Sequence, residues 1–242
     1  MPLPSLVGLA HGSRHPHTVE VIETMMIEAG AILGVEGHAA FLENSTPSPA
    51  DVACQLATHG ARQAVFVPLL FTEAYHATDD TPATLRRAAQ SSGISCEQAP
   101  ILGTGEDIVD VLLDHLSAHS AQGPLLLLAI GSSRPDANRD IYALGQRLQT
   151  RLINCGYGAP ESELLVRVAF ATKAPRAREV ISASSQPLTV LPLVTAPGTL
   201  LDRIKVTAED AGGRCLPPLG SRLAPIVAQR YRSVVDANEP VR

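Results

Sequence analysis

The segment Ser5-Leu-Val-Gly-Leu-Ala-His-Gly-Ser-Arg14 contains the clearest strand-and-turn pattern of the chain. A short, mostly apolar run leads directly into His11 and then into a turn at Gly12. A run of this length that ends in a turn is typical of a strand buried on both faces of a sheet. The residues that follow, 17–33, place apolar side chains at helical spacing, so a helix is expected next.

Strand-like and helix-like segments alternate along the rest of the chain. This order predicts an α/β fold in which parallel strands form a sheet and helices cover both of its faces, as in flavodoxin-like doubly wound proteins. Further strands are expected at residues 37–42, 64–71, 94–98, 124–129, 165–170, 188–194 and 214–216, and further helices at 48–59, 81–91, 105–119, 138–153, 176–183, 199–208 and 221–233.

Three short motifs occur twice and in the same order, which indicates an internal duplication. Residues 9–14 resemble 128–134, residues 67–70 resemble 191–194, and residues 100–103 resemble 218–220. We therefore predict two similar lobes, residues 1–120 and 121–242, each a parallel sheet flanked by helices.

Composition excludes several classes of protein. With 45% hydrophobic and 18% charged residues, the chain is neither disordered nor fibrous. Aromatic residues make up only 3%, Trp is absent and the net charge is −5, so nucleic acid is not an expected partner. The four cysteines form no C-x-x-C pair and are expected to be reduced thiols. No signal peptide and no apolar run long enough to cross a membrane is found, so we expect a cytoplasmic protein without membrane contact.

Charge divides unevenly between the two predicted lobes. Residues 1–120 hold four Arg, fourteen acidic residues and all eight His, whereas residues 121–242 hold fifteen basic and ten acidic residues. One interpretation is a cleft with a cation on the first lobe and an anionic substrate on the second. The alternative is drift of solvated surface charge.

Two histidines are the leading candidates for chemistry. His11 ends the first strand, and His76 follows the third strand after a short loop. Both therefore lie at the carboxyl edge of the predicted sheet, where parallel α/β folds build their sites. A pair of imidazoles that leaves coordination positions open suits a late first-row divalent metal. The alternatives are a buried histidine satisfied by the fold for His11 and a solvent-facing loop residue for His76.

Four further residues lie near the same strand ends. Glu43 ends the second strand and could bind metal or accept a proton, although a capping or loop carboxylate is the alternative. Ser13 offers a hydroxyl in the loop after His11. Arg14 and Arg134 follow the duplicated first strands at what look like matching positions, and guanidinium groups suit substrate carboxylates. A surface role for either Arg is the alternative.

Motifs for organic cofactors and for other common chemistries are absent. The sequence contains no G-x-x-x-x-G-K-[ST] and no G-x-S-x-G, and Gly103-Thr-Gly105 lacks the third glycine of a dinucleotide fingerprint. No organic cofactor is therefore expected.

The residues named so far resemble those of a known family. Leu9-Ala-His-Gly-Ser-Arg14, Phe41-Leu-Glu43 with Thr46-Pro-Ser48, and Val67-Pro-Leu-Leu-Phe71 running to His76 are similar to the sirohydrochlorin chelatases. These are class II chelatases, related to the cobalt-inserting enzymes of cobalamin synthesis and the iron-inserting enzymes of sirohaem synthesis. The resemblance extends over the whole chain as two chelatase-like lobes.

The resemblance implies a lyase that inserts Fe²⁺ or Co²⁺, with Ni²⁺ as a further candidate, into a metal-free tetrapyrrole such as sirohydrochlorin. His11 and His76 fall on the family's metal-binding histidines, and Glu43 falls on its strand-end glutamate. Ser13, Arg14 and Arg134 would bind the substrate. Glu73-Ala-Tyr75 departs from the glycine-containing loop that is common before the second histidine, which leaves metal choice and substrate fit open.

The second lobe cannot hold an equivalent metal site, because Ile130 stands where the first lobe has His11 and residues 197–199 stand near the place of His76. One metal site per chain is expected, in a monomer or a homodimer. Two other classes of function remain open: a protein that delivers or senses metal without a tetrapyrrole, and another α/β enzyme that uses His11 and Arg14 on a phosphate.

Overall fold

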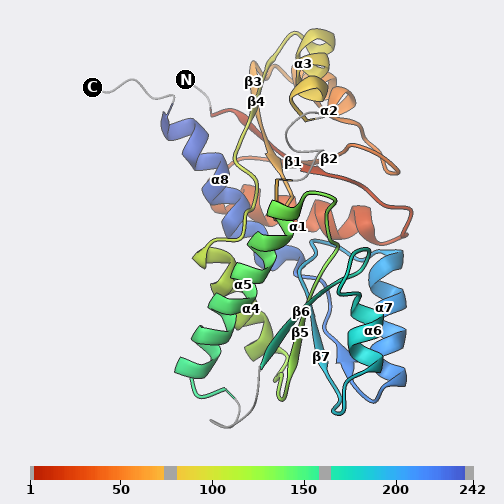
Figure 1. The fold of residues 1–242 in the computed structure, drawn as a ribbon. Coiled ribbons are helices and arrows are strands. Elements are labelled where there is room, and N and C mark those ends of the chain that lie inside the picture. Colours follow the sequence, from red (N-terminus) through yellow and green to blue (C-terminus); the bar gives the residue numbers. More distant parts are fainter. Residues whose placement is uncertain (1–2, 74–80, 158–164, 238–242) are drawn as a thin grey trace. The chain divides into compact units, whose positions relative to one another are not determined.

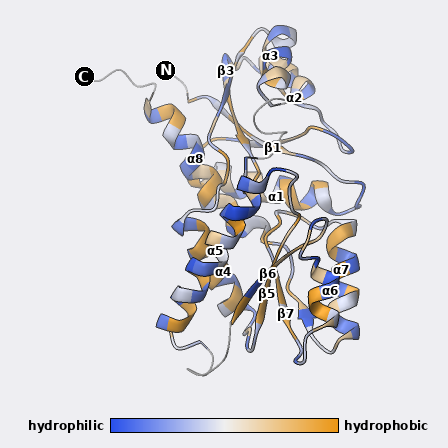
Figure 2. Ribbon diagram, in the orientation of Figure 1, coloured by the Kyte–Doolittle hydropathy of each residue, from blue (hydrophilic) through white to orange (hydrophobic). Residues whose placement is uncertain are grey.

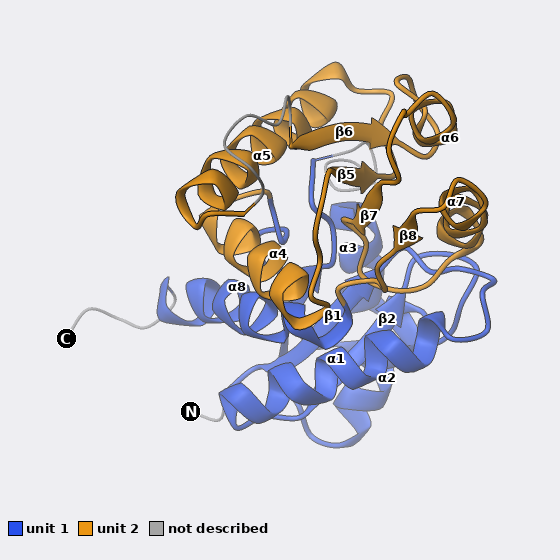
Figure 3. Ribbon diagram, turned by 90° about the horizontal axis from the view of Figure 1, so that it is seen from below, with its two compact units in different colours: residues 1–103, 220–242 blue, residues 104–219 orange. Residues whose placement is uncertain are grey.

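The computed structural model describes residues 3–73, 81–157 and 165–237, which divide into two compact units (Figures 1 and 3). Unit 1 comprises residues 1–103 and 220–242, and unit 2 comprises residues 104–219. Each unit has one four-stranded sheet in which every pair of neighbouring strands is parallel. The predicted fold class, an α/β protein built from two similar parallel sheets, is confirmed.

The sheet of unit 1 has the strand order β2-β1-β3-β4. A 3-10 helix, Gly220–Leu223, precedes the last helix of the unit. The strands are β1 (Ser5–Ala10), β2 (Gly37–Phe41), β3 (Gln63–Pro68) and β4 (Ser95–Gln98), and the helices are α1 (Thr18–Leu33), α2 (Pro49–Thr58), α3 (Thr81–Ser92) and α8 (Ala224–Ala237).

The sheet of unit 2 repeats this order as β6-β5-β7-β8. Its helices lie on both sides of the sheet, with α4 and α5 opposite α6 and α7 (Figure 1). The strands are β5 (Leu125–Ala129), β6 (Val166–Phe170), β7 (Thr189–Pro192) and β8 (Arg214–Cys215), and the helices are α4 (Glu106–Ala118), α5 (Pro135–Asn154), α6 (Ala177–Ser182) and α7 (Thr199–Asp210).

The central strands form because both of their faces are covered. In β1, Val7 and Leu9 join the core beneath α2 and α3, while a side chain at Gly8 would collide with Met26 of α1 on the other face. All five residues of β5 are buried, and Figure 2 shows apolar colouring along this strand. Burial on two faces explains why both strands read as continuous apolar runs in the sequence.

The sheets follow the predicted lobes, but the final helix of each sequence repeat belongs to the other unit. Helix α4 lies in unit 2, where Arg147 of α5 contacts Glu106 at 3.1 Å and Arg151 contacts Asp110 at 2.8 Å. Helix α8 lies in unit 1, where it packs on α1 and where Arg230 donates hydrogen bonds to the backbone of Ile101 and Leu102. The boundaries of the compact units therefore differ from those of the predicted lobes, residues 1–120 and 121–242.

This exchange of helices also changes the distribution of charge. Unit 1 holds 8 basic and 12 acidic residues, and unit 2 holds 11 basic and 12 acidic residues. The net charges are −4 and −1, because the acidic helix α4 belongs to unit 2. The contrast seen between the two sequence halves therefore does not describe the folded units, and electrostatic arguments must start from local groups.

None of the described helices has both the length and the apolar character that a transmembrane segment requires.

Candidate active site

The loop between β1 and α1 is held directly against the end of β2. Gly12 has φ +93°, and a Cβ atom at this position would lie 1.8 Å from the backbone oxygen of Glu43. Only glycine combines this backbone conformation with such a close approach. The N–H of Glu43 in turn donates to the backbone oxygen of His11 at 2.8 Å. His11 and Glu43 therefore occupy adjacent, fixed positions at the carboxyl edge of the sheet.

Two serines lock the same pair of loops together. The N–H of Ser13 donates to Ser45 Oγ at 3.1 Å, and Ser45 Oγ donates to the backbone oxygen of Ser13 at 2.9 Å. Ser13 Oγ accepts a hydrogen bond from the N–H of His15 at 3.1 Å. The predicted hydroxyl of Ser13 thus shapes the loop, and it keeps one proton to donate. Ser45 was not among the residues predicted from the sequence.

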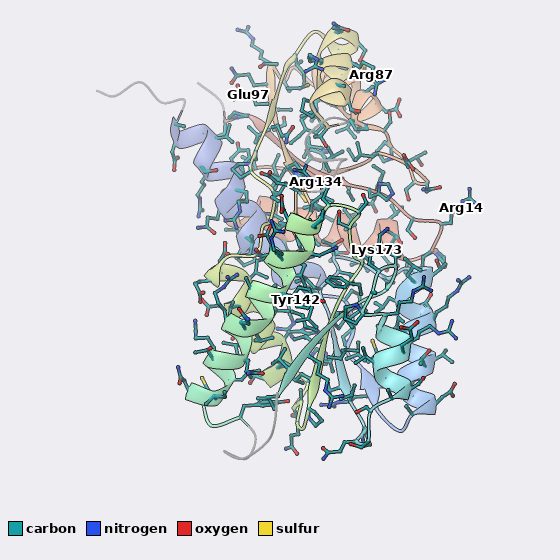
Figure 4. All side chains as sticks on the ribbon, viewed as in Figure 1. Arg14, Arg87, Glu97, Arg134, Tyr142 and Lys173 are labelled. Carbon is teal, nitrogen blue, oxygen red and sulfur yellow. The ribbon has the colours of Figure 1, made fainter. Side chains whose placement is uncertain are left out.

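The side chains of the site lie open to solvent. His11 and Glu43 are both exposed, so the alternative of a buried His11 does not hold. Arg14 is also exposed, and Figure 4 shows its side chain reaching outward from the β1–α1 loop. Parallel strand ends place His11, Glu43 and Arg14 at one edge of unit 1, as expected from the sequence.

His15 and His17 extend the imidazole-rich loop. His15 Nδ1 accepts a hydrogen bond from the N–H of His17 at 3.2 Å, so in the neutral ring the proton lies on Nε2. His17 Nδ1 lies 3.4 Å from a carboxylate oxygen of Glu20. Within the described parts of the chain, no three His, Cys, Asp or Glu side chains form a group able to hold a metal. His76, the second predicted ligand, falls outside the described residues.

Two of the four cysteines, Cys96 and Cys215, offer no thiolate to such a site. Burial raises the pKa of Cys96 to about 11, and it raises the pKa of Cys215 to about 12. Both therefore remain thiols at neutral pH. The described cysteines are free, as expected.

Unit 2 repeats the backbone of the site with different side chains. Gly131 has φ +90°, and the N–H of Thr172 donates to the backbone oxygen of Ile130 at 3.0 Å. These groups correspond to Gly12, Glu43 and His11 of unit 1. Ile130 replaces the histidine and Thr172 replaces the glutamate, so this strand end lacks both ligand types at these two positions.

The repeated hydrogen bonds correct one predicted correspondence. The N–H of Arg134 donates to Ser132 Oγ at 3.1 Å, as the N–H of His15 does to Ser13 Oγ. Arg134 therefore matches His15, and the residue that matches Arg14 is Ser133. The two arginines were aligned one residue out of register because Gly-Ser-Arg and Gly-Ser-Ser-Arg look alike around a gap that the structure does not contain.

Three comparisons place the chain among known proteins. Residues 5–119 match the family model CbiX. The chain is 27% identical over 154 residues to a sirohydrochlorin cobaltochelatase of Priestia megaterium, covering 60% of this chain and 50% of the relative. It is 26% identical over 179 residues to a sirohydrochlorin ferrochelatase of the same organism, covering 70% of this chain and 64% of the relative.

The fold agrees with these matches. The sirohydrochlorin chelatase SirB from Bacillus subtilis subspecies spizizenii, solved in complex with cobalt, superimposes with a TM-score of 0.78 at 20% identity. The superposition covers 98% of this chain and 97% of SirB. The family model falls on the repeat that carries His11 and Glu43, while the structural likeness spans both units. The first repeat of the chain therefore matches the CbiX family model, and the chain is similar to sirohydrochlorin chelatases in sequence and to SirB in fold.

Proposed function

We propose that this protein inserts a divalent metal, Fe²⁺ or Co²⁺, into the metal-free tetrapyrrole sirohydrochlorin. The observation that carries this proposal is the fixed placement of His11 and Glu43 at adjacent strand ends, bound through a 2.8 Å backbone hydrogen bond. An exposed imidazole beside an exposed carboxylate gives an open cation-binding edge with a base next to it. The names of the two relatives support the same reaction.

The reaction exchanges one metal dication for two pyrrole protons. His11 and, by the family resemblance, His76 would hold the metal through neutral imidazoles and pass it to the macrocycle nitrogens. Glu43, or an imidazole freed of metal, would accept the departing protons. The metal is a substrate in this scheme, and no organic cofactor takes part.

Cationic and hydroxyl groups would hold the anionic rim of the tetrapyrrole. Arg14 lies beside the metal-binding edge, Ser13 retains a hydroxyl proton, and Arg134 lies at the matching edge of unit 2. Guanidinium groups bind carboxylates with charge-assisted hydrogen bonds. The enzyme would work in the cytoplasm as a monomer or homodimer, with Ni²⁺ as a further candidate substrate.

Replacement of His11 tests the proposal. His11→Ala should lower the rate of Co²⁺ insertion into sirohydrochlorin at least about 100-fold without changing the far-ultraviolet circular dichroism, because the side chain is exposed. His59→Ala is the matched control, since His59 is an exposed histidine at the C-cap of α2, at the other end of that helix from the β2–α2 loop. Insertion is followed by the change in the tetrapyrrole absorption spectrum.

Two outcomes would contradict the proposed function. Near-wild-type turnover of His11→Ala would remove His11 from the site. Tight Co²⁺ binding by the wild-type protein without any spectral change on adding sirohydrochlorin would favour a protein that delivers or senses metal.

A further inference from the structure

The carboxyl edge of the sheet in unit 2 carries cations at three positions where unit 1 has a histidine or an uncharged polar residue. Comparison of the two repeats shows three such changes. Arg134 stands in place of His15, Lys173 stands one residue after the equivalent of Glu43, and Arg176 is the N-cap of α6 where Ser48 is the N-cap of α2. In the loops after the first two strands of each unit, one change runs the other way, from Arg14 to Ser133.

Lys173 is positioned by the glycine of the repeated loop. A Cβ atom at Gly131 would lie 3.1 Å from Cγ and 3.2 Å from Cβ of Lys173, and 3.0 Å from Cβ of Phe170. The base of the lysine side chain therefore packs directly over the β5–α5 loop. Phe170 is in turn fixed by an edge-on contact with Tyr142, whose ring centroid lies 5.6 Å away. This packing anchors the stem of Lys173 and leaves its ammonium group in solvent.

The three cations lie at one edge of one sheet. Arg134 precedes α5, and Lys173 and Arg176 lie in the segment between β6 and α6, so all three follow the ends of neighbouring parallel strands. Figure 4 shows Arg134 and Lys173 at the same end of unit 2. All three side chains are exposed, and no acidic residue in the described part of the chain forms an ion pair with any of them. The nearby carboxylate of Asp136 is paired with Arg139 instead.

We propose that Lys173, together with Arg134 and Arg176, forms a carboxylate-binding site through which unit 2 holds the acidic side chains of the tetrapyrrole. This inference rests on the proposed function and adds the residue that sets the preference for a highly carboxylated macrocycle. Cations that lack protein partners gain most from an anionic ligand, and several spaced positive charges match a rim of several carboxylates. The exposed N-terminus of the long helix α5 beside Arg134 favours the same ligand charge.

The chain offers an internal control for this assignment, because Lys173 and Lys205 are its only two lysines. Lys205 lies on α7 within reach of Glu209, away from the strand ends. The native protein is acetylated briefly with acetic anhydride, with and without an octacarboxylate porphyrin, and the modification of each lysine is read by mass spectrometry. The porphyrin should lower acetylation of Lys173 about 5-fold or more and leave Lys205 unchanged.

Inorganic phosphate and a dicarboxylate porphyrin complete the labelling experiment. Both should protect Lys173 less than the octacarboxylate porphyrin does. Equal protection by phosphate would overturn the assignment in favour of a phosphate ligand, and no selective protection of Lys173 by any porphyrin would overturn it outright.

Substitution gives an independent measure. Lys173→Gln should raise the Kd for the octacarboxylate porphyrin about 5- to 20-fold, with a smaller change for the dicarboxylate porphyrin and none in Co²⁺ affinity. Lys205→Gln removes the same charge and should change the Kd less than about 2-fold, while Lys173→Arg should keep most of the affinity. Equal effects of Lys173→Gln and Lys205→Gln would show that porphyrin affinity depends only on the net charge of the protein, and would overturn the assignment.

Failure of this inference can be told apart from failure of the proposed function. If the wild-type protein inserts metal but Lys173 is neither protected nor required for porphyrin binding, the carboxylate site is wrong and the function stands. If Lys173 is protected by the porphyrin but no metal is inserted, the carboxylate site stands and the function is wrong.

Discussion

Gly12 shows how one residue can fix the geometry of the whole site. Its hydrogen atom faces the backbone oxygen of Glu43, where a methyl group would lie 1.8 Å away, and its φ of +93° is itself unfavourable for any side chain. The neighbour is backbone and carries the hydrogen bond between Glu43 and His11, so it cannot yield without moving the site.

We therefore expect Gly12→Ala to lower the free energy of unfolding by about 2–4 kcal/mol and to abolish metal insertion. Gly34→Ala is the control, because Gly34 also has a positive φ but has no atom within 4 Å of the added carbon. It should cost only about 1–2 kcal/mol and leave insertion intact. Urea unfolding measures both variants, and equal costs would show that the close contact with Glu43 has no influence.

The start of α2 predicts a dependence of stability on pH. Ser48 Oγ donates to Asp51 Oδ2 at 2.6 Å, and the N–H of Ser48 donates to the same oxygen at 3.0 Å. The Ser48 hydroxyl, followed by its backbone N–H, holds the pKa of Asp51 below its ordinary value. Because the folded-state pKa is lowered, the stabilisation is present at neutral pH and is lost as the pH falls below about 4 through that pKa.

Ser48→Ala should cost about 1 kcal/mol of stability at pH 7, where the capping box is intact. The difference between wild type and variant should shrink on acidification, as Asp51 takes up its proton in the wild type. Thermal unfolding followed between pH 3 and pH 7 gives the result, and Asp51→Asn should flatten the pH dependence. A gap that grows towards low pH would contradict this account of the cap.

Among the elements, the two repeats place a glycine on opposite sides of the contact between the first strand and the first helix. Gly8 lies on the strand in unit 1, and Gly145 lies on the helix in unit 2. In unit 1 the strand contributes Gly8 and the helix contributes Met26, with the methionine sulfur 2.2 Å from where a Cβ of Gly8 would lie. In unit 2 the glycine is on the helix instead: a Cβ atom at Gly145 would lie 2.5 Å from Cγ2 of Val168 in β6 and 3.7 Å from Cδ2 of Leu127 in β5. In both units larger side chains fill the space beside the glycine.

This exchange predicts a measurable coupling between β1 and α1. Gly8→Ala should destabilise the protein by about 1–3 kcal/mol through overpacking, and Met26→Ala should destabilise it by about 2–4 kcal/mol through a cavity. The double variant should be more stable than the sum of the two costs predicts, by about 1–2 kcal/mol. Strict additivity in urea unfolding would show that the two positions do not share this space.

The same elements show what the sequence could predict. Strands buried on both faces, such as Ser5–Ala10 and Leu125–Ala129, stand out as apolar runs, and the repeat of strand order follows from the alternation of strands and helices. The placement of His11 and Glu43 at one edge could be predicted because the carboxyl ends of parallel strands meet there. Ser45 and Lys173 were missed, since their roles depend on contacts between loops. The repeats align without a gap from β1 to α1, where Gly8 pairs with Leu127 and Met26 with Gly145. The pairing of Glu43 with Thr172 needs ten further residues in the second repeat, so the sequence alone did not bring Lys173 to this edge.

Across the whole molecule, charge is distributed differently from what the two sequence halves suggest. The contrast between a very acidic and a basic half disappears once α4 is counted with unit 2, where its carboxylates pair with Arg147 and Arg151. Those arginines are used in holding α4. Arg134, Lys173 and Arg176 stand at the strand ends without an ion pair among the described residues, so local placement and not net charge distinguishes the two edges.

The exchange of helices makes the division of the chain testable. A fragment of residues 104–219 keeps α4, whose buried residues include Ile108, Leu112 and Leu116, and keeps the 3.0 Å contact between His115 Nε2 and the backbone oxygen of Pro217. A fragment of residues 121–242 loses all of these contacts. Each large apolar side chain contributes about 1.5–3 kcal/mol on burial, so their loss is comparable to the whole stability of a domain of this size.

We therefore expect residues 104–219 to unfold cooperatively in urea and residues 121–242 to show no cooperative transition, both followed by circular dichroism. A cooperative transition of residues 121–242 at the same urea concentration as that of residues 104–219 would show that α4 is dispensable and that the sequence repeats, not the compact units, are the folding units.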